Sequence, residues 1–188
     1  IGITGSAVDV DDVVETANHF RCIDMVIDSA NAQISERFIK RLHAVLKSGT
    51  SDCRKAWFAV GDCKKLPNEV GGQDTAQPEQ VAAEMRKLLD SYHKSTSKTL
   101  AEILDFHVRF ERIHPFQDGN GRVGRLLMFK ECLRNNIVPF IISDDLKVFY
   151  YRGLQQWGTE NGYLTDTCLT AQDRFKQVLT YFKILGFL

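Results

Sequence analysis

The feature that constrains this chain most is a polar stretch of twelve residues, His114 to Arg125, between two helical runs. The run before it, Leu100 to Ile113, has apolar residues at helical spacing, so we predict a helix there. Pro115 disfavours the α conformation for the residue before it, which predicts that this helix stops at His114. Gly119-Asn120-Gly121 predicts a sharp turn into a second helix, about Gly121 to Asn135. The stretch therefore predicts a loop that feeds the N-terminus of a helix.

The second half of the stretch suits the binding of a polyphosphate. The free N–H groups of Gly119-Asn120-Gly121 and the positive end of the helix dipole can hold phosphate oxygens. Arg122 and Arg125 are three residues apart, so we expect them to share one helix face. Two guanidinium groups beside free N–H groups are typical of a phosphate-binding site.

The first half supplies groups for metal binding and proton transfer. Asp118 is a hard oxygen ligand, the type that Mg²⁺ prefers when it also contacts phosphates. His114 is a base that can work near pH 7. The stretch therefore predicts a site that binds a nucleotide with Mg²⁺ and deprotonates an incoming hydroxyl.

The stretch resembles the signature of the Fic family, H-x-F-x-[D/E]-G-N-G-R-x-x-R, with every fixed position filled. The resemblance implies a helical fold with the motif helix in the middle and the transfer of AMP from ATP to a Ser, Thr or Tyr hydroxyl of a target protein. It implies that His114 is the general base and that Asp118 holds Mg²⁺ between the α- and β-phosphates. It assigns the β- and γ-phosphates to Arg122 and Arg125. Phe116 is an apolar residue in a polar loop, so we expect it to anchor the loop in the core, and the family assigns it the same role.

Two further regions take a role from the resemblance. Trp57–Val60 and Leu66–Gly72 are predicted to pair as a small hairpin, and a Fic flap of about residues 64–74 would align the target protein by strand addition. An ordinary surface hairpin is the alternative. Tyr150 and Tyr151 are expected near the adenine, with plain packing as the alternative.

Many Fic proteins also carry a self-inhibiting motif, [S/T]-x-x-x-E-[G/N], whose glutamate pairs with the second motif arginine, here Arg125. Where the family places it, residues 1–6 contain no glutamate. Glu160-Asn161 offers the last two positions, but Gln156 stands where Ser or Thr is required. The inhibitory motif is therefore absent, trimmed or altered, and we expect this form to transfer AMP without release of inhibition.

Other readings of the motif stay open. Fic-like enzymes also use other nucleotides, transfer phosphocholine or remove AMP from a modified protein. A non-catalytic nucleotide-binding module is a further alternative, although an intact His114 argues against it because pure binding needs no base. Self-modification and a homo-oligomer also stay open.

Histidines and charged residues outside the motif receive weaker assignments. His107 is interpreted as a core histidine and not as a metal ligand, since no second ligand stands at metal-binding spacing. Three others are interpreted as surface or boundary residues: His19, His43 and His93. Three residues near the end of the first motif helix are candidates to support the loop from behind: Arg109, Glu111 and Arg112.

Composition limits the class of protein. Lys plus Arg and Asp plus Glu are 24 each, so no overall basic charge favours nucleic acid or a membrane surface. No apolar run approaches the length of a membrane span, and no signal peptide opens the chain. Five widely spaced cysteines favour reduced thiols and a cytoplasmic location over disulfides or zinc.

We predict a single, mainly α Fic-type domain over residues 1–188, with about seven or more helices and one small hairpin. The chain opens on Ile1 without Met, so a native N-terminal segment is expected to be missing. Besides the two motif helices, helices are predicted at Asp9–Ala30, Ser35–Lys47, Pro78–His93, Asp144–Trp157 and Asp166–Phe182. The stretch Ile137–Ile142 is predicted to be a packed connection.

Overall fold

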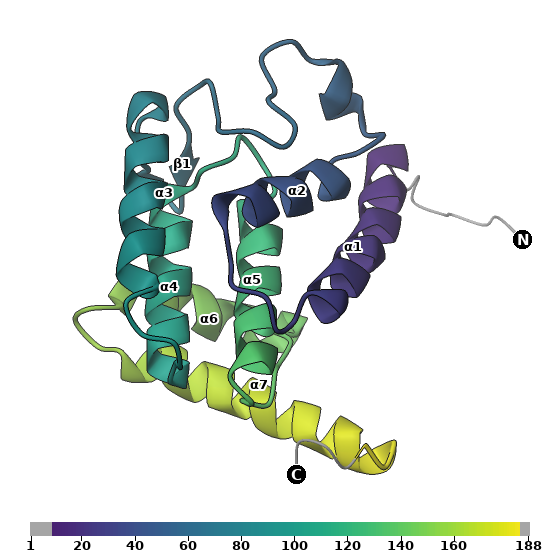
Figure 1. Ribbon diagram of the computed structural model, residues 1–188, viewed down its shortest axis with the longest axis vertical. Helices are drawn as coiled ribbons and strands as arrows, with labels where there is room; N and C mark the ends of the chain where they lie inside the picture. The colour runs from purple at the N-terminus through teal and green to yellow at the C-terminus, as the bar shows by residue number, and fades with distance from the viewer. Residues whose placement is uncertain (1–8, 185–188) are drawn as a thin grey trace, which may run out of the picture.

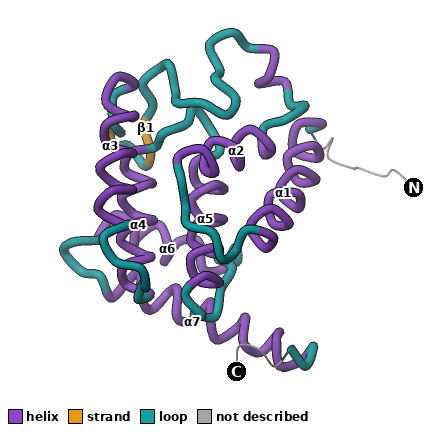
Figure 2. Tube along the Cα trace, viewed as in Figure 1, coloured by secondary structure: helices purple, strands orange, loops and turns teal. Residues whose placement is uncertain are grey.

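The computed structural model describes residues 9–184, which form seven α helices, two short 3₁₀ helices and one two-stranded sheet (Figures 1 and 2). The elements in order are α1 (Val10–Asp28), α2 (Glu36–Leu46), η1 (Ser51–Arg54), β1 (Glu69–Val70), β2 (Gln73–Asp74), α3 (Pro78–Tyr92), α4 (Leu100–Ile113), α5 (Asn120–Arg134), η2 (Asp144–Leu146), α6 (Lys147–Gln156) and α7 (Gly162–Tyr181). The predicted mainly α fold with a small hairpin is confirmed.

Helix α5 lies in the middle of the fold (Figure 1), with α3 and α4 on one side, α1 on the other and α7 across one end. This central position explains why α5 has buried side chains on several of its faces. One core cluster joins α1, α2, α3, α4 and α5, and a second joins α4, α5, α6 and α7. Helix α5, which carries the motif at its N-terminus, is therefore held by two cores at once.

Local sequence explains where α4 begins and ends. Thr99 accepts a hydrogen bond from the Glu102 N–H, and the Glu102 side chain accepts one from the Thr99 N–H, which is a capping box. The helix ends at Ile113, and His114 takes the left-handed conformation with φ 51° and ψ 63°. Pro115 excludes the ordinary helical conformation at His114, so the predicted stop is confirmed.

The predicted hairpin was wrong in its first strand, Trp57–Val60, whereas its second, Leu66–Gly72, contains β1. Residues 57–60 form no strand. The chain turns there, the Phe58 N–H donates to the Lys55 carbonyl, and the Phe58 side chain is buried. The two strands lie later in the chain, with Glu69 opposite Asp74 and Val70 opposite Gln73. Gly71 and Gly72 both have positive φ, 58° and 73°, which a two-residue hairpin turn requires.

The remaining boundaries differ by small amounts. Helix α7 begins at Gly162, four residues before the predicted start, because the turn around Asn161 already opens the helix. The predicted helix from Asp144 starts as the 3₁₀ turn η2 and continues as α6. All five cysteines are free thiols, as predicted. Within the described residues, no helix has the length and apolar character needed to cross a membrane.

Candidate active site

The loop of the motif is closed by the side chain of Asn120. Its Oδ1 accepts a hydrogen bond from the Phe116 N–H at 2.8 Å, and its Nδ2 donates to the Phe116 carbonyl at 2.7 Å. Asn120 is buried, so this side chain shapes the loop and is not free to bind a ligand. Phe116 is buried and stacks on His43 with ring centroids 3.9 Å apart, which confirms that it anchors the loop in the core.

Gly119 makes the turn into α5 with φ 83°, a conformation that favours glycine. A Cβ at this position would lie 3.3 Å from Leu46 and 3.5 Å from His43, so the loop also packs tightly on α2. The chain then enters a helix of 15 residues whose first turn lacks acidic side chains. The N–H groups of that turn therefore keep a positive field in front of the loop.

His43 was placed wrongly by the sequence analysis, which interpreted it as a surface or boundary residue. It is fully buried, because it follows Ile39 and precedes Leu46 at helical spacing on the inner face of α2. Its Nδ1 accepts a hydrogen bond from the Gly61 N–H at 2.9 Å, so its Nε2 carries the proton and donates to the Asp118 carbonyl at 3.1 Å. Burial lowers the pKa of His43 to about 4, so it stays neutral and links the Gly61 backbone to the motif loop.

His114 is held in one tautomer by its own helix. Its Nδ1 lies 3.1 Å from the Glu111 carbonyl oxygen, which can only accept, so Nδ1 carries the proton and Nε2 carries the lone pair. Burial lowers the pKa of His114, and the nearby Lys64 ammonium acts in the same direction. The imidazole is therefore neutral at pH 7 and can accept a proton at Nε2.

A cavity of about 470 Å³ lies in front of His114. Its size falls in the usual range for small-molecule sites. Residues from α4, α5, α6 and the hairpin line it: Val70, Gly71, Gln73, Val108, Glu111, Arg112, His114, Gly121, Arg125, Tyr150, Tyr151, Leu154 and Gln155. Arg125 and both tyrosines thus line the same cavity as His114.

The two tyrosines differ in environment. Tyr150 is buried, and its hydroxyl lies 2.6 Å from His107 Nε2. Tyr151 is 52% exposed and packs edge-on against Tyr150 with centroids 5.4 Å apart. Tyr150 therefore belongs to the floor of the cavity, whereas Tyr151 offers a ring at its rim.

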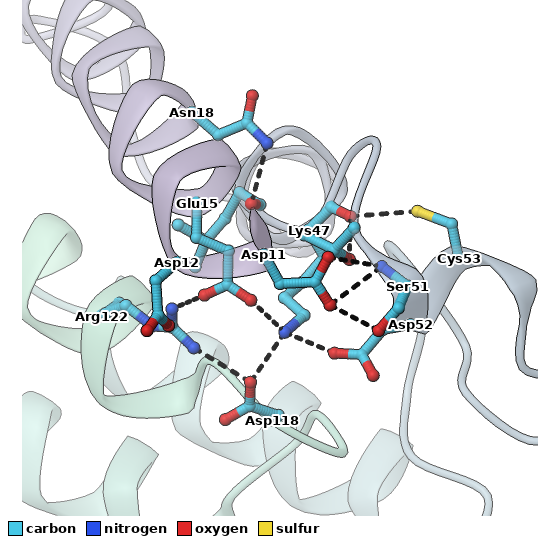
Figure 3. A network of polar contacts seen from close by, with 12 residues as sticks. Asp11, Asp12, Glu15, Asn18, Lys47, Ser51, Asp52, Cys53, Asp118 and Arg122 are labelled. Atoms are coloured by element: carbon cyan, nitrogen blue, oxygen red, sulfur yellow. Dashed lines mark hydrogen bonds and ion pairs between the residues drawn. The ribbon is translucent and has the colours of Figure 1, made fainter. Parts of the chain in front are cut away.

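Asp118 lies in a network of ion pairs on the other flank of the motif (Figure 3). Its Oδ2 contacts Lys47 Nζ at 2.8 Å and Arg122 Nη2 at 2.9 Å. Lys47 also pairs with Glu15 and Asp52, and Arg122 also pairs with Glu15. Arg122 is thus directed towards α1 and α2, while Arg125 lines the cavity, so the two arginines reach different surroundings.

Lys47 is the buried centre of this network, with 1% of its surface exposed. Burial opposes its charge, but the Asp118 and Asp52 carboxylates outweigh that effect and raise the pKa of Lys47. The carboxylates of Glu15, Asp52 and Asp118 place oxygens within 4.8 Å of one another. The ammonium group already balances part of that negative charge. Both described contacts of the Asp118 carboxylate use Oδ2, so Oδ1 on its half-exposed side chain suits a divalent cation.

The Fic/DOC family model matches residues 33–132, more than half of the chain. The chain belongs to the Fic/DOC family. This confirms the relationship that the motif predicted, and the matched residues run from just before α2 into α5, so they include the whole site loop.

Relatives named protein adenylyltransferase Fic support the same family. The protein from Drosophila erecta is 34% identical over 137 residues, which cover 69% of this chain and 28% of the relative. The protein from Drosophila virilis is 29% identical over 137 residues, with 69% and 28% covered. The chain therefore spans less than a third of the length of these Fic relatives.

Solved Fic structures share the fold. A Fic domain containing signaling protein from Bacteroides thetaiotaomicron superposes with a TM-score of 0.72 at 26% identity, covering 100% of this chain and 73% of the other. Fic-1 from C. elegans superposes with a TM-score of 0.72 at 19% identity, covering 98% and 55%. The second likeness concerns the fold alone.

The ion-pair network around Asp118 was not predicted from the sequence of this Fic chain. Glu15, Lys47 and Asp52 come from α1, α2 and η1, and no spacing in the sequence links them to the motif. Residues 1–6, where the inhibitory glutamate was sought, lie outside the described part of the chain. At the other end, Glu160 lies in the turn before α7, where its Oε1 accepts from the Gly162 N–H at 3.0 Å.

Proposed function

We propose that this Fic chain transfers AMP from ATP to a hydroxyl side chain of a protein. The observation that carries the proposal is His114, a neutral imidazole in a fixed tautomer at the wall of a nucleotide-sized cavity. The name of the Drosophila relatives, protein adenylyltransferase, supports it. A structural neighbour, BepC from Bartonella tribocorum, was solved with bound AMPPNP, at 18% identity and a TM-score of 0.59.

In this proposal His114 Nε2 takes the proton of the target hydroxyl, so that the oxygen can attack the α-phosphorus of ATP. The N–H groups of the first turn of α5, from Asn120 and Gly121, hold the α-phosphate oxygens as negative charge builds up. The side chain of Asn120 contributes indirectly, because it fixes the loop that presents these groups.

Arg125 lines the cavity and would bind the leaving pyrophosphate. Arg122 would have to exchange a carboxylate partner, Glu15 or Asp118, for a phosphate. Asp118 would hold Mg²⁺ through Oδ1, and the ion would supply positive charge that offsets the negative charge on the α-phosphate and on the departing pyrophosphate. The Tyr151 ring would cover one face of the adenine, with Tyr150 beneath it.

The hairpin β1–β2 is the proposed docking edge for the target, within the segment of about residues 64–74. Val70, Gly71 and Gln73 line the cavity, so an extended peptide added to this edge would pass His114. The base of the hairpin is fixed to the motif loop. The Lys64 N–H donates to the Pro115 carbonyl at 2.8 Å, and Asn68 Nδ2 donates to the Phe116 carbonyl at 3.0 Å.

The test is to incubate the chain with Mg²⁺ and ATP labelled at the α-phosphate. The chain itself and the proteins of a cell lysate serve as acceptors of the labelled AMP. We expect label on protein, and we expect His114→Ala to reduce labelling by about 10²- to 10⁴-fold while ATP binding, followed by calorimetry, stays within a few-fold. Loss of ATP binding in the variant would contradict the role of His114 as a base. ATP binding without any label on protein would contradict AMP transfer and favour another donor or the removal of AMP.

A further inference from the structure

Glu111 is a buried carboxyl group that the proposed reaction does not yet use. It lies on α4 one turn before His114, it lines the cavity, and only 8% of its surface is exposed. Its Oε2 lies 4.0 Å from His114 Nδ1. Its Oε1 has no hydrogen-bond partner among the described residues. A buried carboxyl with an unpaired oxygen is costly, so its position beside the base needs an explanation.

The backbone of α5 keeps Glu111 in this position. A Cβ on Gly124 would lie 2.4 Å from Glu111 Oε1 and 3.0 Å from His107 Cε1, so only a glycine lets the two helices approach this closely. The same close approach excludes water from the unpaired oxygen. The motif therefore contributes, through Gly124, a dry slot for one carboxyl group next to its histidine.

Charged and titratable groups surround the pair on every side. His114 faces Lys64 from the base of the hairpin and Asp118 from the motif loop. Glu111 faces Arg125 on α5, while His107 on its own helix and Tyr150 on α6 complete the pocket. His107 is buried and burial lowers its pKa to about 3, so it stays neutral.

We propose that Glu111 is a positioning residue that stabilises His114 in the protonated form that it reaches during transfer. This inference rests on the proposed function. In that step the O–H bond of the target hydroxyl breaks and its proton bonds to His114 Nε2. The oxygen keeps the electron pair and attacks the α-phosphorus, and the bond to pyrophosphate breaks with its electron pair on the leaving group. Glu111 neither gains nor loses a proton, and its carboxylate balances the new charge on the ring.

The charge of Glu111 changes close to neutral pH. Burial raises the pKa of Glu111 to about 7, and the Arg125 guanidinium opposes that rise. Because the two groups are only 4.0 Å apart at their closest nitrogen and oxygen, the first proton that binds belongs to the pair and not to either residue alone. The pair is ready to accept the hydroxyl proton only when it holds no other.

The first experiment measures His114 directly and needs no nucleotide. The side-chain Cε1–H signal of His114, assigned by its absence in His114→Ala, is followed by NMR from pH 4 to 9. We expect a two-step titration in the native chain, with the first step near pH 7. In Glu111→Gln we expect a single step whose midpoint is about one pH unit lower or more, because a carboxylate at this distance shifts a pKa by roughly 1–3 units. Glu79→Gln, an exposed glutamate on α3, is the matched control and should leave the signal unchanged.

The second experiment measures AMP transfer against pH. Glu111→Gln is expected to lower kcat by about tenfold or more, with KM for ATP within about twofold, because the ring charge forms only after ATP has bound. The acid limb of the kcat profile should move to lower pH. Glu111→Asp, which retains the charge one methylene further away, should fall between the two and tests the proposal again if the Gln variant folds poorly.

The outcomes separate the two proposals. An identical His114 titration in the native chain, Glu111→Gln and Glu111→Asp would overturn the role of Glu111, whatever the transfer activity. A shifted titration in a chain that transfers no AMP would support the pairing of Glu111 with His114 and overturn the proposed reaction. A rise in KM for ATP with kcat and its pH profile unchanged would assign Glu111 to binding and overturn its action through His114.

Discussion

The two flanks of the motif treat buried charge in opposite ways. On the ion-paired flank (Glu15, Lys47, Asp52, Asp118 and Arg122) every charged group has an opposite partner within hydrogen-bonding reach. On the orphan flank (His107, Glu111, Arg125 and Tyr150), Glu111 Oε1 and His107 Nδ1 are buried without a partner among the described residues.

This difference suggests two roles: the ion-paired flank holds the motif loop in place, and the orphan flank takes part in proton transfer. Burying a charge is tolerated when its partners are complete, so the ion-paired flank can lock α1, α2 and η1 to the motif loop. Leaving a buried group unpaired costs free energy, and proteins keep such groups mainly where their unusual pKa is used. The first flank holds the loop, and the second leaves its groups able to respond to a proton.

The largest expected effect comes from removing the centre of the ion-paired flank. Lys47→Met leaves Glu15 and Asp118 with Arg122, and Asp52 with the more exposed Lys55, and we expect a loss of about 3–5 kcal/mol in the free energy of unfolding. Urea denaturation at pH 7 measures it. Lys55→Met, which removes an exposed partner of Asp52, is the control and should cost less than about 1 kcal/mol. Equal small losses in both variants would mean that the network does not lock the loop.

A further experiment uses the pH dependence of stability to test whether burial raises the pKa of Glu111 on the orphan flank. Because burial raises the pKa of Glu111 to about 7, the folded chain binds more protons than the unfolded chain between about pH 4.5 and 7. Stability of the native chain should therefore fall, relative to Glu111→Gln, as pH rises through that window, by on the order of 3 kcal/mol in total. Below pH 4.5 and above pH 7 the difference should be flat. Denaturation curves of both proteins at pH 4.5, 6 and 8 measure it, and a constant difference would contradict the assigned burial.

The smallest expected effect concerns the hydrogen bond between Tyr150 and His107 on the orphan flank. Tyr150→Phe removes the hydroxyl that lies 2.6 Å from His107 Nε2 and leaves that buried nitrogen unpaired as well. We expect a loss of about 1–3 kcal/mol in the free energy of unfolding. Tyr151→Phe, at an exposed ring, is the matched control and should change it by less than about 0.5 kcal/mol. If the two variants behave alike, the hydroxyl of Tyr150 is not holding His107.

Sequence reasoning worked best where one segment decides its own structure. The bounds of α4 followed from the apolar spacing of Leu100 to Ile113 and from Pro115, both local signals. The predicted starts of α2 and α3 are within a residue of those found, since Ser35 and Pro78 are local start signals too. The anchoring of Phe116 followed from an apolar residue in a polar loop.

It failed where distant segments decide. Phe58 leaves its predicted strand because its ring packs beside Lys47 and His43, which the local apolar pattern does not reveal. Arg122 and Arg125 were expected to act on one face, but Glu15 on α1 draws Arg122 away from the cavity. Glu111 was named only as a support for the loop. Its burial beside His114 depends on how closely α5 approaches α4, and Gly124 leaves the room for its side chain.

The polar tie at the base of the hairpin has a consequence for how such a protein can diversify. Lys64 Nζ donates to Asn68 and Thr75, each at 2.6 Å, so the two ends of the hairpin segment are joined beneath it. The tip at Gly71-Gly72 takes no part in that tie. Loop tips accept insertions and substitutions far more readily than pinned segments do. The sequence and length of the tip can therefore vary in evolution while the base of the hairpin keeps its distance from His114.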